Sequence, residues 1–278
     1  MLRFKLAYGT NGYRRHPLAE AVKRIAEFGY DGVDLMADRP HAYPMDLDEE
    51  ARMRIKNLLE DYNLELSNVH GGSVKGAFPT YEPTFVSPQE EDRAKRIEYT
   101  KDCVDLAAFL GAKNVSIVSG KCEAGGPPET AWDWFIEGVT ECVDYGRERG
   151  VIIALEPEPE FLIETSDEAL RALNCVDSAW FGINFDVGHV HYRGESIPKS
   201  VEKLGKRIVH VHLEDIKDLK HFHRVPGDGD INFREFIESL GKAGYRGFLT
   251  VELYTYAHDP DPAAQRSISY LRKLLSKQ

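Results

Sequence analysis

The sequence predicts a single (β/α)8 barrel that spans residues 1–278. Apolar, strand-like runs alternate with segments of helical periodicity eight times, which implies parallel β-α-β units. Glycines follow four of the predicted helices just before the next strand, as short helix-to-strand turns require: Gly29, Gly111, Gly150 and Gly244. The length suits one α/β barrel. An open doubly wound sheet is the weaker alternative, because no G-x-G-x-x-G follows the first strand.

The first four units occupy the N-terminal half of the chain. Pro17 stands at the start of the first helix, where its missing N–H costs little. The predicted strands cover residues 3–8, 31–36, 64–70 and 112–119. The predicted helices cover residues 17–28, 47–62, 90–110 and 128–149.

The last four units have the most apolar strands. These strands are expected at residues 151–156, 181–186, 208–212 and 248–252. The helices that follow them are expected at residues 166–173, 197–203, 232–243 and 262–275.

Each of these last four strands carries one polar residue near its C-terminal end: Glu156, Asp186, His212 and Glu252. A carboxylate or imidazole at the end of a buried parallel strand needs a reason, and the C-terminal face is where α/β barrels place their active sites. Taken singly, each residue could be a strand-end cap or an ion-pair partner. Together they form an oxygen-rich ligand set for one divalent ion, with Mn²⁺ expected first and Mg²⁺, Co²⁺ or Zn²⁺ as alternatives.

Two histidines and a glutamate are expected on the same face. His70 ends the third strand, and Glu158 lies in an acidic loop from which it can reach the cavity. His189 is expected in a loop after the sixth strand, where it contacts a substrate hydroxyl or orients a metal ligand. His210 shares a strand face with His212 but lies one layer deeper, as a packed interior histidine.

Residues 221–230 (HFHRVPGDGD) are predicted to form a polar, turn-rich loop. From it His223 and Arg224 are expected to project over the site, with Arg224 offering a planar donor fork to substrate oxygens. In the alternative, His221 and His223 are ligands of additional metals. The long segment 71–88 carries Phe78, Tyr81 and Phe85, which are predicted to close over a sugar ring as a lid.

The bulk composition is that of a globular protein, with 42% hydrophobic and 29% charged residues. The net charge of -11 argues against nucleic-acid binding, which needs clustered Lys and Arg. No apolar run approaches the roughly 18 residues of a membrane span, and no signal peptide is recognised. A cytoplasmic protein without membrane association is therefore expected.

Five short motifs resemble those of sugar isomerase/epimerase-type barrels, the xylose isomerase-like superfamily that also contains endonuclease IV. The motifs are residues 154–157 (ALEP), 184–189 (NFDVGH), 210–215 (HVHLED), 226–231 (PGDGDI) and 250–253 (TVEL). Residues 28–33 (FGYDGV) and 39–42 (RPHA) are similar to ketose 3-epimerases of the tagatose/psicose and fructosamine type.

The resemblance implies that Glu156, Asp186, His212 and Glu252 bind one metal, and that the two glutamates also move a proton beside the substrate carbonyl. It further implies that His189 and Arg224 bind substrate. The predicted function is metal-dependent isomerisation or epimerisation of a keto-sugar through an enediolate. By analogy with these families, a homodimer or homotetramer is expected.

One departure leaves the substrate open. Ketose 3-epimerases commonly carry a substrate-binding glutamate where this chain has Leu162. A lyase or dehydratase acting on a keto-inositol or a 3-keto-glycoside is therefore an alternative. Endonuclease IV-like hydrolysis is a weaker one, because the fourth strand supplies no histidine and the chain is acidic. A non-enzymatic sugar-binding module is the remaining alternative.

Overall fold

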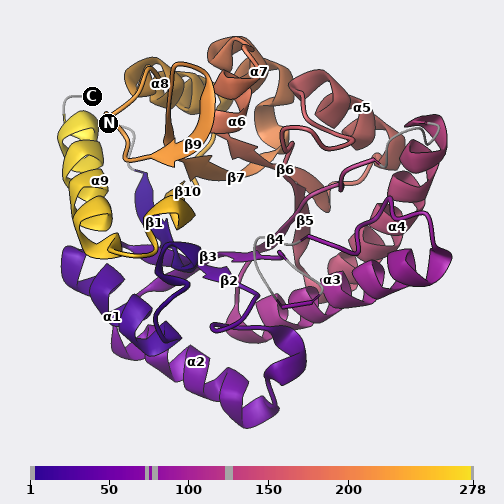
Figure 1. Cartoon of the computed structure of the whole chain (residues 1–278), viewed down its shortest axis with the longest axis horizontal. Helices are drawn as coiled ribbons and strands as arrows, with labels where there is room; N and C mark the ends of the chain where they lie inside the picture. The colour runs from indigo at the N-terminus through magenta and orange to yellow at the C-terminus, as the bar shows by residue number, and fades with distance from the viewer. Residues whose placement is uncertain (1–3, 73–74, 77–80, 123–127, 277–278) are drawn as a thin grey trace.

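Eight parallel strands close into a barrel in the computed structural model, which describes residues 4–72, 75–76, 81–122 and 128–276 (Figure 1). Around the barrel the strands follow one another in chain order, and β10 closes the ring by pairing with both β7 and β1. The strands are β1 (Lys5–Gly9), β2 (Gly32–Met36), β3 (Glu65–His70), β4 (Asn114–Ile117), β5 (Ile152–Leu155), β6 (Phe181–Asp186), β7 (Ile208–Leu213) and β10 (Phe248–Val251).

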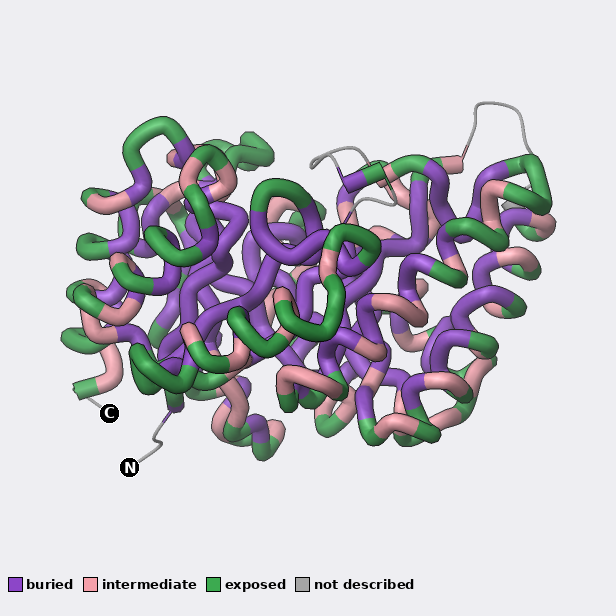
Figure 2. The backbone as a smooth tube through the Cα atoms, turned by 90° about the horizontal axis from the view of Figure 1, so that it is seen from below, coloured by how far each residue is buried: buried purple, intermediate pink, exposed green. Residues whose placement is uncertain are grey.

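Helices surround the barrel and cover its outer side (Figure 1). They are α1 (Leu18–Phe28), α2 (Glu49–Asp61), α3 (Glu90–Leu110), α4 (Pro128–Arg149), α5 (Ser166–Val176), α6 (Val187–Tyr192), α7 (Ile197–Leu204), α8 (Phe233–Ala243) and α9 (Pro260–Leu275). Figure 2 shows buried backbone through the interior, with exposed residues on the outer turns of the helices. Among the described helices, none combines the length and apolar character needed to span a bilayer.

The predicted fold class is confirmed, and so are its eight strand and helix units. The glycines at positions 29, 111, 150 and 244 all have positive φ angles between 70° and 87°, as residues that follow a helix end commonly do. Element boundaries differ by a few residues. Helix α1 begins at Leu18 rather than at Pro17, because Pro17 has extended backbone and serves as the N-cap.

The strand register brings the C-terminal ends of three strands level. Asp186 of β6 pairs with His212 of β7, and His212 in turn pairs with Thr250 of β10. Glu252 therefore lies two residues beyond the partner of His212, and Glu156 directly follows β5. The register thus gathers side chains from four strands at one end of the barrel, as the sequence predicts.

The segment after β7 is more ordered than expected. Residues 221–230 were predicted as a loop, but β8 (Asp215–Lys217) and β9 (Lys220–Arg224) form an antiparallel hairpin over this part of the chain. Alternation along β9 places residues 221 and 223 on one face and residues 222 and 224 on the other. His189 also departs from its predicted loop, because it lies in the short helix α6.

Asp215 fixes the turn that follows the hairpin. Its buried carboxylate accepts backbone N–H groups of Gly227 and Gly229, both at 2.8 Å, and of Ile231 at 3.1 Å. A side chain at Gly229 would collide with this carboxylate, since a Cβ there would lie 2.3 Å from Asp215 Oδ1. One carboxylate thus holds the PGDGD turn against the hairpin.

Asp215→Ala should lower the free energy of unfolding by about 3 kcal/mol, because it leaves buried backbone N–H groups without an acceptor. Urea denaturation followed by circular dichroism measures this change. Asp228→Ala is the matched control in the same turn. It removes only the exposed ion pair with Arg266 and should cost less than about 1 kcal/mol. Equal losses in the two variants would contradict this role for Asp215.

Candidate metal site at the barrel mouth

The structure brings the four predicted metal ligands together, all buried, at the C-terminal end of the barrel. His212 Nδ1 lies 2.9 Å from Glu156 Oε1 and 3.9 Å from Glu252 Oε2. One donor atom each from Asp186, His212 and Glu252 lies within 4.8 Å of the others. The imidazole therefore stands between two glutamates that come from β5 and β10.

Asp34 of β2 orients the His212 ring. Its Oδ2 lies 2.7 Å from His212 Nε2, and its Oδ1 accepts a hydrogen bond from Asn68 at 3.0 Å. A carboxylate that accepts a hydrogen bond from the N–H of one ring nitrogen leaves the other nitrogen available for a metal. Asp34 was not predicted as a site residue, although a carboxylate inside a buried strand is a pattern that indicates one.

The charges around His212 favour the protonated, positively charged form of its ring. Burial alone disfavours the protonated ring, but the carboxylates of Glu156 and Glu252 outweigh it and raise the pKa of His212 well above its usual value. Burial would likewise raise the pKa of Glu252, yet the neighbouring His212 and His223 hold it well below the usual range. Glu252 is therefore ionised at neutral pH.

Glu252 has a second, neutral partner. Asn11, in the turn after β1, donates a hydrogen bond from Nδ2 to Glu252 Oε1 at 2.7 Å. His223 Nδ1 lies 3.3 Å from the other oxygen, Oε2. Both carboxylate oxygens are thus held in place. Asn11 was not predicted, because a residue in a short 3-10 turn carries no periodicity that would show where it points.

Asp186 joins the start of α6 to the site. Its Oδ1 accepts the backbone N–H of His189 at 2.8 Å, as the N-cap of α6. Its Oδ2 is buried, and no N–H group of the described residues donates to it; only the carboxyl of Glu214, when protonated, is placed to do so. A buried carboxylate oxygen without an N–H donor fits a coordinated cation, and the set of three carboxylates and one imidazole suits a hard or borderline divalent ion.

Glu214 packs beside Asp186 and was not predicted. It is fully buried, and burial together with the negative charge of Asp186 raises its pKa well above the usual value. It fits there because residue 188 is glycine: a Cβ at Gly188 would lie only 1.6 Å from Glu214 Oε1. A neutral Glu214 avoids a further negative charge beside Asp186.

Three of the four predicted substrate-binding residues also reach the site. The His70 ring stacks on that of His212, with centroids 5.5 Å apart, and its Nδ1 lies 3.8 Å from Glu252 Oε1. His189 is buried and donates from Nδ1 to the backbone oxygen of Pro157 at 3.0 Å. Glu158 approaches the same nitrogen at 3.7 Å.

His189 and Glu158 have shifted pKa values. Burial disfavours the charged form of His189, but the carboxylates of Asp186 and Glu158 outweigh it and raise the pKa of His189 to about 9. Burial raises the pKa of Glu158 to about 7, although His189 opposes the rise. Glu158 thus titrates in the neutral range, where acid–base groups are most useful.

Arg224 is the predicted substrate-binding residue whose side chain does not reach the site. Its guanidinium lies 5.3 Å from the ring centre of Phe222, on the face of β9 opposite to His223. His210 is the interior histidine that was expected: Nδ1 lies 3.0 Å from Asn184 Oδ1 and Nε2 lies 3.0 Å from Thr250. Burial lowers its pKa to about 3, so it is neutral.

The lid over the site stays a prediction, and of its three residues Tyr81 alone keeps a place in it. Tyr81 packs edge-on against Phe161, with ring centroids 5.6 Å apart. Phe85 is not a lid residue, because it is fully buried and packs against Phe135 of α4. Phe78 lies outside the described residues. Leu162 packs against the hydrophobic core, which agrees with its apolar character and leaves no carboxylate at that position.

Comparison with known proteins gives consistent similarities. The model of the family described as "Xylose isomerase-like TIM barrel" matches residues 22–274. The chain is 27% identical to fructoselysine 3-epimerase from Shigella flexneri over 96% of both chains. It is 26% identical to inosose dehydratase from Mesomycoplasma hyopneumoniae strain J, over 92% of this chain and 88% of that protein.

Two solved structures share the fold. A D-tagatose 3-epimerase-like protein superposes with a TM-score of 0.84 at 24% identity, over 98% of this chain and 97% of the other. The IolI protein with a bound zinc atom superposes with a TM-score of 0.82 at 21% identity, over 99% of both chains. At these identities the structures support the barrel fold and carry no statement about this chain's ligand.

Asp34→Asn should weaken Mn²⁺ binding by about 10- to 100-fold, because the amide no longer fixes the His212 tautomer. Equilibrium dialysis of metal-free protein measures the change. Asp31→Asn, near the other end of β2, is the control, because Asp31 accepts a backbone N–H of Leu6 and should leave Mn²⁺ affinity unchanged. Unchanged Mn²⁺ affinity in a natively folded Asp34→Asn protein would contradict the orienting role.

Glu158→Gln should change how stability depends on pH in chelator-treated protein. The folded pKa of about 7 exceeds the ordinary 4.5, so the folded state holds more protons between these values and wild-type stability falls as pH rises through them. The variant should lack this loss, which amounts to about 2–3 kcal/mol between pH ~4.5 and pH ~8. Urea midpoints across pH test this, with the exposed Glu160→Gln as control. Parallel curves for wild type and Glu158→Gln would refute it.

Proposed function

Because the chain belongs to the xylose isomerase-like TIM barrel family, we propose that it is a divalent-metal-dependent isomerase or epimerase of a keto-sugar or sugar derivative. One observation carries the proposal: two buried glutamates from β5 and β10 flank a single imidazole at the barrel mouth. The similarity to a fructoselysine 3-epimerase over nearly the whole chain supports it.

Glu156, Asp186, His212 and Glu252 would hold the ion. A bound divalent cation supplies Lewis-acid polarisation of a carbonyl and its adjacent hydroxyl, which makes the neighbouring C–H more acidic. Mn²⁺ is the ion we propose first, because three carboxylates with one imidazole suit it well. Asp34 would hold the His212 ring in position for the ion by accepting a hydrogen bond from Nε2–H.

Glu252 is the better placed of the two glutamates to act as a base. It is ionised because His212 and His223 lower its pKa, and Asn11 fixes the orientation of its carboxylate. It would take a proton from the carbon beside the carbonyl, and Glu156 would return a proton on the opposite side. Return to the same carbon gives epimerisation, whereas return to the neighbouring carbon gives aldose–ketose isomerisation. The roles of the two glutamates reverse in the back reaction.

The surrounding groups would orient a small polar substrate. His189, His70 and Glu158 lie beside the four ligands, and Glu158 titrates near neutral pH, so it can donate or accept a proton from a hydroxyl. Tyr81 and Phe161 provide an apolar contact near this mouth. We therefore propose a sugar rather than a nucleic acid as the partner, in keeping with the net charge of -11.

A dehydratase is the second candidate. It is favoured by Leu162, which packs into the core where ketose 3-epimerases commonly have a glutamate, and by the similarity to an inosose dehydratase. The same two glutamates serve both reactions, because dehydration also begins with removal of a proton beside a carbonyl. Products distinguish the two: an epimer keeps the mass of the substrate, and a dehydration product loses water.

Glu156→Gln and Glu252→Gln should each abolish deuterium incorporation from D₂O into the substrate, since neither amide can accept the proton. Wild-type protein with Mn²⁺ is first screened on ketoses, 3-keto-glycosides and keto-inositols, and exchange is followed by NMR and mass spectrometry. The exposed Glu160→Gln is the control and should exchange at the wild-type rate. Full exchange in both glutamine variants would eliminate the proton-transfer roles.

A further inference from the structure

Arg96 of α3 is a buried cation that lies outside the candidate metal site. Its side chain is fully buried, although a guanidinium stays charged and loses its hydration on burial. Burial lowers the pKa of Arg96, so its surroundings do not compensate the lost hydration in full. An apolar side chain of similar length would fill the same space without this cost. Packing alone therefore does not explain an arginine at this position.

The guanidinium binds three backbone carbonyl oxygens of one connection, the chain between β3 and α3. Nη2 donates to Gly72 O at 3.0 Å and to Tyr81 O at 2.8 Å. Nε donates to Pro83 O at 3.2 Å. Gly72 stands near the end of β3, whereas Tyr81 and Pro83 stand nearer to the start of α3. The planar donor fork of an arginine can hold both ends of this connection together, which a single ammonium group on a flexible stem does less well.

A second arginine holds a point between these two ends. Arg39, in the RPHA motif, donates from Nη1 to Lys75 O at 3.2 Å. Its other nitrogens form an ion pair with Asp46, at 2.5 and 2.7 Å. Gly76 packs so closely on this arginine that a Cβ there would lie 2.8 Å from Arg39 Nη1. The backbone at Lys75 is therefore held, although the residue itself is exposed.

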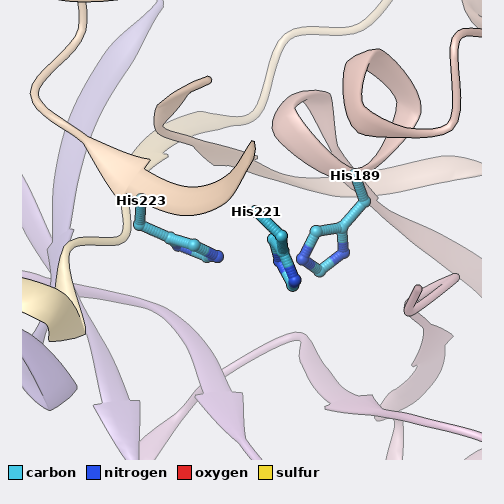
Figure 3. A group of neighbouring side chains, drawn as sticks. All are labelled: His189, His221 and His223. Carbon is cyan, nitrogen blue, oxygen red and sulfur yellow. The ribbon is translucent and has the colours of Figure 1, made fainter. Parts of the chain in front are cut away.

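The same connection reaches the candidate metal site through Tyr81. The Tyr81 ring packs edge-on against Phe161, with centroids 5.6 Å apart, and the N–H of Phe161 donates to Glu158 O at 3.1 Å. The Glu158 carboxylate lies 3.7 Å from His189, one of the three histidines labelled in Figure 3. Burial and the negative charges of Glu158 and Glu252 raise the pKa of Tyr81 well above its usual value, as expected for a phenol close to the carboxylates of the site.

We propose that Arg96 is a positioning residue of this site, which holds Tyr81 at the barrel mouth and does not itself touch the substrate. The inference rests on the proposed function, because it gives the Tyr81 ring the apolar C–H face of a sugar as its partner. Aromatic side chains commonly form the apolar walls of such pockets, while a few polar groups fix the orientation of the ligand. The hydrogen bonds from Arg96 hold the backbone of Tyr81, and a side chain on a held backbone contacts a ligand more precisely.

Trypsin cleavage after Lys75 tests the role of Arg96 without any substrate, and so independently of the proposed reaction. Arg96→Met leaves three carbonyl oxygens without their donor and should speed cleavage of the full-length protein at this bond at least about tenfold, because the connection opens more easily. Arg93→Met is the matched control on the same helix, since Arg93 donates to Ser87 O and Pro88 O, each at 2.9 Å. It should leave the cleavage rate after Lys75 unchanged.

Mass spectrometry identifies the bond that is cut, and circular dichroism confirms that each variant is folded. If Arg96→Met does not fold, Arg96→Lys takes its place, because it keeps the charge but loses the planar fork, and it should also speed cleavage after Lys75. A wild-type cleavage rate in the folded Arg96 variant overturns the proposal, whether or not any sugar is turned over.

Steady-state kinetics then separates positioning from a general loss of stability, with the ketose, 3-keto-glycoside or keto-inositol that the wild type exchanges in D₂O. Arg96→Met and Tyr81→Ala should each raise KM about five- to tenfold with little change in kcat, because each removes the same contact with bound sugar. The double variant should be no worse than either single one, whereas independent effects would multiply. Mn²⁺ affinity should stay at the wild-type value in all three variants. An unchanged KM in Tyr81→Ala, or multiplied effects in the double variant, would overturn the proposal.

Discussion

The structure depends on one electrostatic constraint, because the barrel mouth buries five carboxyl groups close to the His212 ring. They belong to Asp34, Glu156, Asp186, Glu214 and Glu252. Each ionised carboxylate removed from water costs several kcal/mol unless positive charge or hydrogen-bond donors compensate it. The chain compensates Glu252 with Asn11 and two histidines, and it keeps Glu214 neutral through burial. A divalent cation held by Glu156, Asp186, His212 and Glu252 would balance the carboxylates of this cluster.

Protons and metal ions therefore compete for the same space. The carboxylates that would hold a cation also raise the pKa of His212, so in the metal-free protein a proton occupies the side of the ring where a metal would bind. Asp34 would accept a hydrogen bond from Nε2, the other ring nitrogen, whether or not a metal is bound. The orientation of the His212 ring would therefore be the same in both forms. Through this contact, Asp34 on β2 orients the His212 ring on β7.

Sequence patterns predicted the fold and the convergence of the four strand-end residues, because these residues interrupt apolar runs at equivalent positions. They did not reveal Glu214 or Asn11. Glu214 is buried only because Gly188, on another element, leaves room for it, and Asn11 lies in a turn without periodicity. The hairpin was also missed, since its strands of three and five residues are rich in charged and imidazole side chains rather than apolar ones. For Glu214 and Asn11 the deciding contact is made by a residue distant in sequence, whereas the hairpin is a local pairing without an apolar pattern.

The hairpin also decides which side chains face the site. Because β9 alternates, His221 and His223 face the mouth while Arg224 lies with Phe222 on the opposite side, and a shift of one residue in register would exchange the two pairs. His223 Nδ1 donates to the backbone oxygen of Glu252, and its Nε2 is buried without a hydrogen-bond partner among the described residues. The Nδ1 of this ring also lies 3.3 Å from Glu252 Oε2. The register of the hairpin therefore decides which side chain supports the residue expected to remove the substrate proton.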